Sequence, residues 1–131
     1  MKQQLKAVED FHNAFLQEMG TEPRLLKDKE SQLRYNLMDE ENKEYIEACR
    51  EADLIGIADA LGDQLYILCG TILKHGMQYK IEEVFTEIHR SNMSKLGADS
   101  KPVFREDGKI LKGPGYFKPN IKPILLPHEN V

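Results

Sequence analysis

The chain has 131 residues, 40% of them apolar, and its 18 Lys and Arg face 22 Asp and Glu for a net charge of −4. This size supports one core and excludes two independent ones. Residues 1–100 hold 12 basic and 19 acidic side chains, whereas residues 101–122 hold six and two. The acidic body argues against a binder of duplex DNA or RNA, whose contact face is broadly basic.

The first half of the chain predicts two helices. One is expected over about residues 4–19, where an apolar face recurs at steps of three and four and consists of Leu5, Val8, Phe11, Phe15 and Met19, and Gly20 ends it. A connector over residues 21–29 follows. The second helix is expected over about residues 30–51.

The second half predicts two further helices and an irregular tail. Asp53 is a suitable N-cap for a helix over residues 54–74, which Gly76 ends. A fourth helix is expected over about residues 80–94. From about residue 97 onward, glycines and prolines crowd a basic tail that we expect to be extended or turn-rich. We therefore expect a single all-α domain over residues 1–131, with a four-helix-bundle-like body over about residues 4–96.

Residues 54–73 are long and apolar enough to raise the question of a membrane span. Asp59 and Asp63 lie near the centre of this segment, and each would cost roughly 2.5 to 3.5 kcal/mol on insertion scales. We expect the central helix of a soluble bundle and no membrane. Residues 1–16 mix charged with apolar residues and lack a secretory pattern, so we expect a cytoplasmic protein.

Acidic residues fall on faces of the second and third helices that should point inward. Glu41 and Glu44 lie within the apolar arc of the second helix. On the third helix, Asp59 and Asp63 are the two charges within residues 54–73, and they lie one turn apart on one face. Unpaired buried carboxylates would cost several kcal/mol each, so we expect cations beside them.

The nature of these side chains indicates which cation to expect. Oxygen ligands without His or Cys favour Mg²⁺, or Mn²⁺ as a substitute, over zinc or copper. We predict Glu41, Glu44, Asp59 and Asp63 as ligands. Such ions can bridge a polyphosphate, polarise the attacked phosphorus and lower the pKa of a bound water. The pattern predicts a metal-dependent hydrolase that has no side-chain nucleophile and acts on a phosphorylated small molecule.

Two motifs resemble a known family. Glu40-Glu41-Asn42-Lys43-Glu44, followed by Asp59-Ala60-Leu61-Gly62-Asp63, resembles the E-E-x-x-E then E-x-x-D signature of the MazG, dimeric dUTPase and phosphoribosyl-ATP pyrophosphohydrolase group, over about residues 33–96. The resemblance implies that Glu41, Glu44 and Asp63 bind Mg²⁺ and that Glu40 is a ligand or base. It also implies cleavage of a nucleoside triphosphate between its α- and β-phosphates. The chain departs from the signature at Ala60, where the second motif has glutamate, and Asp59 on the same helix face is the candidate substitute.

Residues at the end of the fourth helix and in the tail offer contacts for a nucleotide. Asn92 can read a base or sugar edge, and Lys95 and Lys112 can neutralise phosphate charge. Tyr116 can stack on a base, and Arg105 adds a further cation. In the group that the chain resembles, an Asn and a Lys at this place contact substrate. The alternative for Arg105 and Lys112 is that they are simply solvated.

Cysteines and histidines show no further site pattern. Cys49 and Cys69 form no C-x-x-C pair, and we expect reduced thiols packed inside helices. We expect ordinary surface positions for all the histidines, which are His12, His75, His89 and His128. Glu9 and His12 have the E-x-x-H spacing of di-iron bundles, but a second such motif is missing.

The hypothesis is thus a nucleoside triphosphate pyrophosphohydrolase whose second and third helices hold the metal and whose fourth helix closes the pocket. A homodimer, or a higher homo-oligomer, is expected to cover apolar flanks that so small a chain leaves exposed. The first alternative is a non-catalytic helical module that binds metal or nucleotide. The second is a di-iron oxidase.

Overall fold

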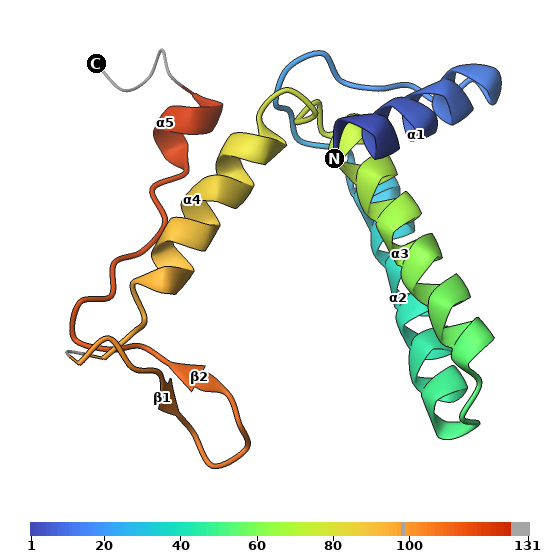
Figure 1. The fold of residues 1–131 in the computed structure, drawn as a ribbon. Helices are drawn as coiled ribbons and strands as arrows, with labels where there is room; N and C mark the ends of the chain where they lie inside the picture. Colours follow the sequence, from blue (N-terminus) through green and yellow to red (C-terminus); the bar gives the residue numbers. More distant parts are fainter. Residues whose placement is uncertain (98, 127–131) are drawn as a thin grey trace. The chain divides into compact units, whose positions relative to one another are not determined.

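The computed structural model describes residues 1–97 and 99–126, and it confirms the expected all-α class (Figure 1). The helices and strands are α1 (Lys2–Ala14), α2 (Asp28–Arg50), α3 (Leu54–Lys74), α4 (Ile81–Met93), β1 (Val103–Phe104), β2 (Ile110–Leu111) and α5 (Lys122–Leu125). The chain divides into two compact units, one over Met1–Tyr79 and one that begins at Lys80. Each unit is described by itself.

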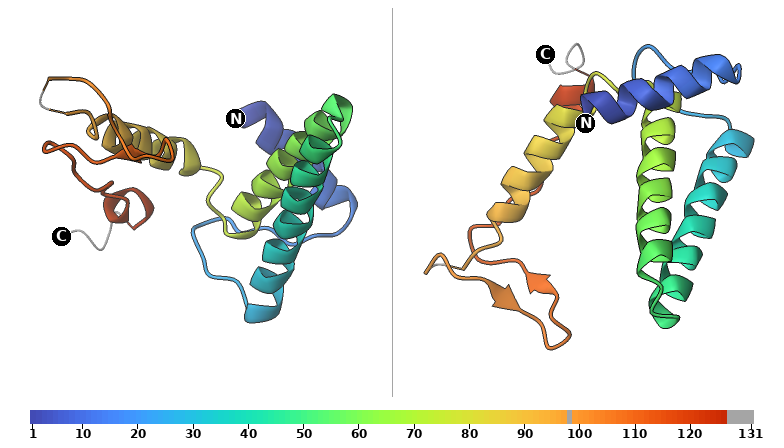
Figure 2. Two further views of the ribbon diagram at one scale, coloured as in Figure 1. Left: turned by 90° about the horizontal axis from the view of Figure 1, so that it is seen from below. Right: turned by 45° about the vertical axis from the view of Figure 1, so that its right-hand side comes forward.

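In the first unit, α2 and α3 form an antiparallel pair joined by a short turn (Figure 2). Asp53 caps α3 as expected, because its Oδ1 accepts a hydrogen bond of 2.9 Å from the Gly56 N–H. Nearer the other end of the pair, the Arg34 guanidinium donates from Nε to Thr71 Oγ1 at 3.0 Å and from Nη2 to the Ile67 carbonyl at 2.9 Å. The Arg34 hydrogen bonds thus join the beginning of α2 to the end of α3, and Asp53 fixes where α3 begins.

The apolar core lies where α1 packs on α3 and α3 packs on α2. Its buried apolar members are Leu5, Val8, Ala48, Ala60, Cys69, Ile72 and Leu73. Both cysteines are free thiols on helices, and Cys69 is buried whereas Cys49 is half-buried. The length of α3 matches the expected residues 54–74, because Asp53 begins it and Gly76, with φ +67°, ends it.

The prediction for α1 was wrong in its end and in its inner face. The helix ends at Ala14 because Leu16 takes a left-handed conformation with φ 57° and the Gln17 N–H donates to the His12 carbonyl at 2.8 Å, which closes the helix. His12 was expected on the surface but is 3% exposed, on the face of Leu5 and Val8. Phe11 and Phe15 are exposed instead and stack on each other, with ring centroids 4.5 Å apart.

Helix α3 keeps a stripe of apolar residues exposed. Among the described residues it is the one helix long and apolar enough to cross a membrane by length and composition alone, which is weak grounds for a span. The exposed stripe recurs at helical spacing and consists of Leu54, Leu61, Leu65 and Leu68. Phe11 of α1 meets Tyr66 of α3 edge-on, with centroids 5.6 Å apart. An apolar surface of this kind is typical of a contact with another molecule.

In the second unit, the tail folds back along α4. Ser91 Oγ donates to the Phe117 carbonyl at 2.7 Å, and the Phe117 N–H donates to Ser94 Oγ at 3.1 Å. The Arg90 guanidinium lies 4.3 Å from the centre of the Phe117 ring. The expected turn-rich tail is present, and within it β1 and β2 form a small antiparallel hairpin.

Candidate metal centre

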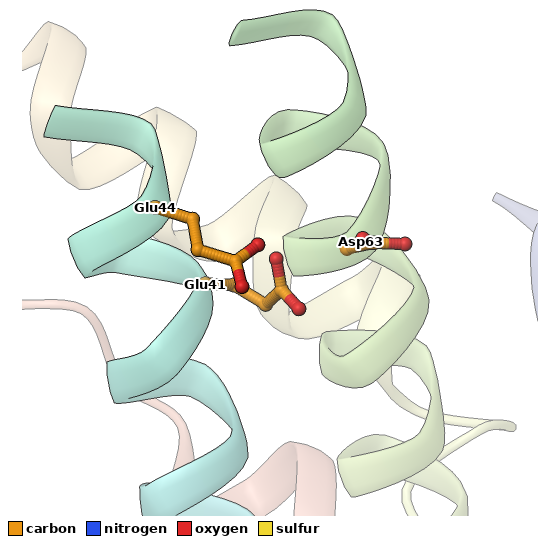
Figure 3. Close-up of side chains that lie close together, drawn as sticks. All are labelled: Glu41, Glu44 and Asp63. Atoms are coloured by element: carbon orange, nitrogen blue, oxygen red, sulfur yellow. The ribbon is translucent and has the colours of Figure 1, made fainter. Parts of the chain in front are cut away.

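Three carboxylates from two helices converge in the first unit. Glu41 and Glu44 lie one turn apart on α2, and Asp63 lies opposite them on α3 (Figure 3). One oxygen of each side chain lies within 4.8 Å of the others. We call Glu41, Glu44 and Asp63 the carboxylate cluster. These three residues were expected to face inward. They meet because α2 and α3 pack against each other along the faces that carry them.

Glu41 is the most constrained member of the cluster. Its Oε2 atom is buried and has no hydrogen-bond partner among the described residues. Burial, hydrogen bonding to Glu44 and the charges of Asp63, Glu44 and Asp59 together raise the pKa of Glu41 from 4.5 to about 7, and burial is the largest of these causes. The nearby Lys43 does not neutralise the cluster, since its Nζ pairs with Asp39 Oδ2 at 2.8 Å. Negative charge therefore accumulates here, and among the described residues no ion pair includes a member of the cluster.

The donor set fits a hard divalent cation. All the donors are carboxylate oxygens, two of the three side chains are partly shielded from water, and one oxygen is buried without a partner. A buried acceptor without a partner and repulsion among close carboxylates are both relieved by a cation between them. Mg²⁺ and Mn²⁺ prefer such oxygen ligands, whereas zinc and copper prefer nitrogen and sulfur.

Two other predicted acidic residues lie outside the cluster. Glu40 and Asp59 are exposed, although the Asp59 charge acts on Glu41 and so lies within electrostatic range. Ala60 is 1% exposed and belongs to the core. Position 60 lies one turn before Asp63 on α3, and a small buried side chain stands there in place of the signature's glutamate. The roles of Glu40 and Asp59 stay predictions.

A polar link beside the cluster was not anticipated from the sequence. Gln64 Nε2 donates to Asn42 Oδ1 at 3.3 Å, which connects α3 to α2. Each of these amides directly follows a cluster residue, since Asn42 follows Glu41 and Gln64 follows Asp63. The signal was available in the sequence as two neutral polar residues at matching places in the two motifs. The hydrogen bond thus joins α2 to α3 directly beside the cluster.

The predicted nucleotide contacts lie in the second unit. Asn92 is exposed near the end of α4, and the Lys95 carbonyl accepts a hydrogen bond of 2.8 Å from Gly113 N–H. Lys112 Nζ lies 4.8 Å from the centre of the Tyr116 ring. The folded-back tail therefore brings several of these residues onto one unit.

Arg105 has a local partner. Its Nε donates to Asp107 Oδ1 at 2.9 Å within the turn between β1 and β2, and this hydrogen bond lowers the pKa of Asp107. Both side chains are exposed, so the pair is weak and leaves Arg105 able to change partner. The substrate-binding roles of Arg105, Lys112, Tyr116, Asn92 and Lys95 are untested predictions.

Comparison with known proteins gives one family. Residues 8–92 match the family model described as Phosphoribosyl-ATP pyrophosphohydrolase. The match spans the second half of α1, all of α2 and α3 and nearly all of α4, and it includes the whole carboxylate cluster. Among curated proteins, no sequence match is significant.

Proposed function

The chain belongs to the phosphoribosyl-ATP pyrophosphohydrolase family, and from this premise we propose that it is a Mg²⁺-dependent nucleoside triphosphate pyrophosphohydrolase. The family membership indicates a hydrolase that acts on a phosphoanhydride bond of a nucleotide. The proposal adds the metal, the substrate class and the bond, which is the one between the α- and β-phosphates. The products are then a nucleoside monophosphate and pyrophosphate, as nucleotide-pool housecleaning requires.

The carboxylate cluster is the observation that carries the proposal. Three acidic side chains whose oxygens lie within 4.8 Å of one another, one with a buried oxygen that lacks a partner, are costly without a cation. A site made of carboxylates alone contains no Ser, Cys or His nucleophile, so the attacking group is water. Hydrolysis of a phosphoanhydride needs water, positioning and positive charge, and it requires no covalent intermediate.

The residues of the cluster have separate roles in this proposal. Glu41, Glu44 and Asp63 hold the metal, and Asp59 supplies a further carboxylate from α3. Bound Mg²⁺ supplies Lewis acidity, since it polarises phosphate oxygens and lowers the pKa of coordinated water. Glu41 or Glu44 orients or deprotonates the water, and Glu40 is the alternative base.

The second unit supplies the nucleotide contacts in this proposal. Asn92 contacts the base or sugar, Lys95 and Lys112 neutralise phosphate charge, and Tyr116 stacks on the base. Arg105 adds a cation once it exchanges Asp107 for a phosphate. Their exposure or partial exposure supports these roles.

We further propose that the chain works as a homodimer, joined through the exposed leucine stripe of α3. A second copy is the occupant that the stripe favours, because Leu54, Leu61 and Leu68 recur every seven residues, as in self-pairing helices. Light scattering after size exclusion should give twice the chain mass. Leu61→Glu should shift the measured mass to that of the single chain. The control Glu47→Gln, at an exposed position of α2, should leave it unchanged. A wild-type chain that runs as a monomer at micromolar concentration would contradict the dimer.

A substrate panel tests the activity. Purified full-length protein is incubated with nucleoside triphosphates and Mg²⁺, and released pyrophosphate is measured. We expect release from at least one triphosphate, dependence on Mg²⁺ or Mn²⁺, and loss of activity in Glu44→Gln. Glu47→Gln is the matched control, because Glu47 is an exposed glutamate one turn along the same helix. Metal binding without release from any substrate would favour the alternative, a non-catalytic binding module.

A further inference from the structure

A second charged cluster lies in the same unit and has the opposite sign. His12 of α1, Arg34 of α2 and Lys74 of α3 meet beside Gly70. A Cβ atom added to Gly70 would lie 2.6 Å from Arg34 Nη2 and 3.1 Å from His12 Nε2, so both nitrogens sit directly over the bare backbone. Burial lowers the pKa of His12, and the charges of Lys74 and Arg34 lower it further. We call His12, Arg34 and Lys74 the cationic cluster.

No acidic side chain balances this cluster among the described residues. Arg34 donates to the neutral oxygens of Thr71 and Ile67, and Lys74 Nζ donates to Gln17 Oε1 at 3.3 Å. None of the ion pairs formed by residues 1–97 and 99–126 includes a member of the cluster. Two permanent positive charges are therefore held close together with neutral partners alone, which is unfavourable in a partly buried place.

The cluster also contains a buried polar atom without a partner. His12 is 3% exposed and Lys74 is 8% exposed, and His12 Nδ1 is buried without a hydrogen bond within the described chain. Arg34 is less buried, and its Nη1 group has no partner recorded among the same residues. Arg34 thus keeps N–H donors free, and its partial exposure lets a ligand reach them from solvent. Unused donors beside uncompensated positive charge are what an anion needs.

We propose that His12, Arg34 and Lys74 form a binding site for a phosphate group, which binds there without a metal ion. Arg34 presents a planar guanidinium whose free N–H groups suit two oxygens of a tetrahedral oxyanion. Lys74 adds a point charge, and His12 adds a donor once it binds a proton. The lack of a side chain at Gly70 lets Arg34 and His12 lie against the backbone of α3, since an added Cβ atom would meet both of them.

The position of this cluster relative to the carboxylate cluster follows from the helix geometry. Arg34 lies seven residues before Glu41 on α2, and Gly70 lies seven residues after Asp63 on α3. Seven residues return to nearly the same helix face and advance it by about 10 Å. The two clusters thus lie along the same α2–α3 seam, one positive and one negative. The phosphate can belong to a nucleotide that also reaches the carboxylate cluster, or it can be free phosphate.

Phosphate binding in the absence of metal tests the proposal. Inorganic phosphate and, separately, a nucleoside triphosphate are titrated into the full-length chain in EDTA, with heat of binding as the readout. We expect saturable binding of at least one of them, weakened at least about tenfold by Arg34→Gln, since a charge-assisted contact is lost. Arg50→Gln, at an exposed arginine on the same helix, should bind as the wild type does. Lys74→Met is the second variant, because it removes charge while keeping the buried stem, and circular dichroism checks that each variant is folded.

The outcomes separate the two sources of phosphate. Binding of inorganic phosphate that depends on Arg34 assigns the site to free phosphate, and binding of the triphosphate alone assigns it to the nucleotide. A ligand-induced shift of the His12 ring nitrogen resonances, which the spectrum of His12→Gln assigns by their disappearance, is a further expected result that a purely structural role would not produce. The proposal is overturned if neither ligand binds the wild-type chain, or if the folded Arg34 and Lys74 variants bind as tightly as the wild type.

This inference does not depend on the proposed hydrolysis. Glu41→Gln should keep its phosphate affinity in EDTA, because Glu41 belongs to the other cluster. Loss of turnover with phosphate binding intact would therefore support both proposals. An active enzyme without metal-independent phosphate binding would remove the cationic site alone.

Discussion

Glu41→Gln should make the metal-free protein less sensitive to alkaline pH. In the folded chain the pKa of Glu41 is about 7 instead of 4.5, because burial and neighbouring carboxylates disfavour its charge. A folded-state pKa above the unfolded one means that stability is fully present below about pH 4.5 and is lost as the pH rises through about 7. Each pKa unit of difference corresponds to about 1.4 kcal/mol, which gives at most about 3.5 kcal/mol. Partial solvation of the cluster reduces the expected loss to roughly 1 to 2 kcal/mol.

Urea denaturation in EDTA measures this difference. Between about pH 5 and about pH 8.5, the free energy of unfolding of the wild type should fall by roughly 1 to 2 kcal/mol more than that of Glu41→Gln. Adding Mg²⁺ at the higher pH should restore stability to the wild type and much less to the variant. Glu47→Gln serves as the control and should follow the wild type. Parallel pH profiles for wild type and Glu41→Gln would refute the claim that Glu41 carries an unfavourable buried charge.

Other predictions address individual positions. Asp63→Asn should lower Mg²⁺-dependent turnover at least about 100-fold while metal-free thermal stability is kept or raised, since it removes repulsion without removing volume; full activity would exclude Asp63 from the site. Asp59→Asn should lower turnover less than Asp63→Asn does, because Asp59 is exposed and outside the cluster; steady-state assays of the two variants side by side decide this. Ala60→Glu should destabilise the fold by roughly 3 kcal/mol or more by placing a carboxylate in the core, and an unchanged melting temperature would contradict the buried position. Gly76→Ala should cost about 2 kcal/mol or more, because Gly76 has φ +67° and an added Cβ would meet the Glu22 carbonyl; urea denaturation is the check.

Local signals in the sequence were sufficient for α3 and for the carboxylate cluster. Asp53 and Gly76 have side-chain and backbone properties that define a helix start and end on their own. The inward position of Glu41 followed from helical phase, which needs no knowledge of the partner helix. Family motifs then connected the two helices.

The parts that were missed depend on tertiary contacts. Leu16 ends α1 in a left-handed conformation that favours glycine or asparagine, so residue type gave no warning. His12 continues the spacing of Leu5 and Val8, and this phase could have indicated a buried position. Histidine is hydrophilic, and the prediction therefore placed His12 on the surface. The charges that act on it belong to Arg34 and Lys74, on helices distant in sequence.

The products formed from a nucleoside triphosphate test the central claim most directly, and ³¹P NMR identifies them in the reaction mixture. With Mg²⁺, the wild-type chain should form nucleoside monophosphate and pyrophosphate in equal amounts, and Glu41→Gln should form neither at a comparable rate. Formation of nucleoside diphosphate and phosphate, or equal rates in the wild type and the variant, would contradict the account.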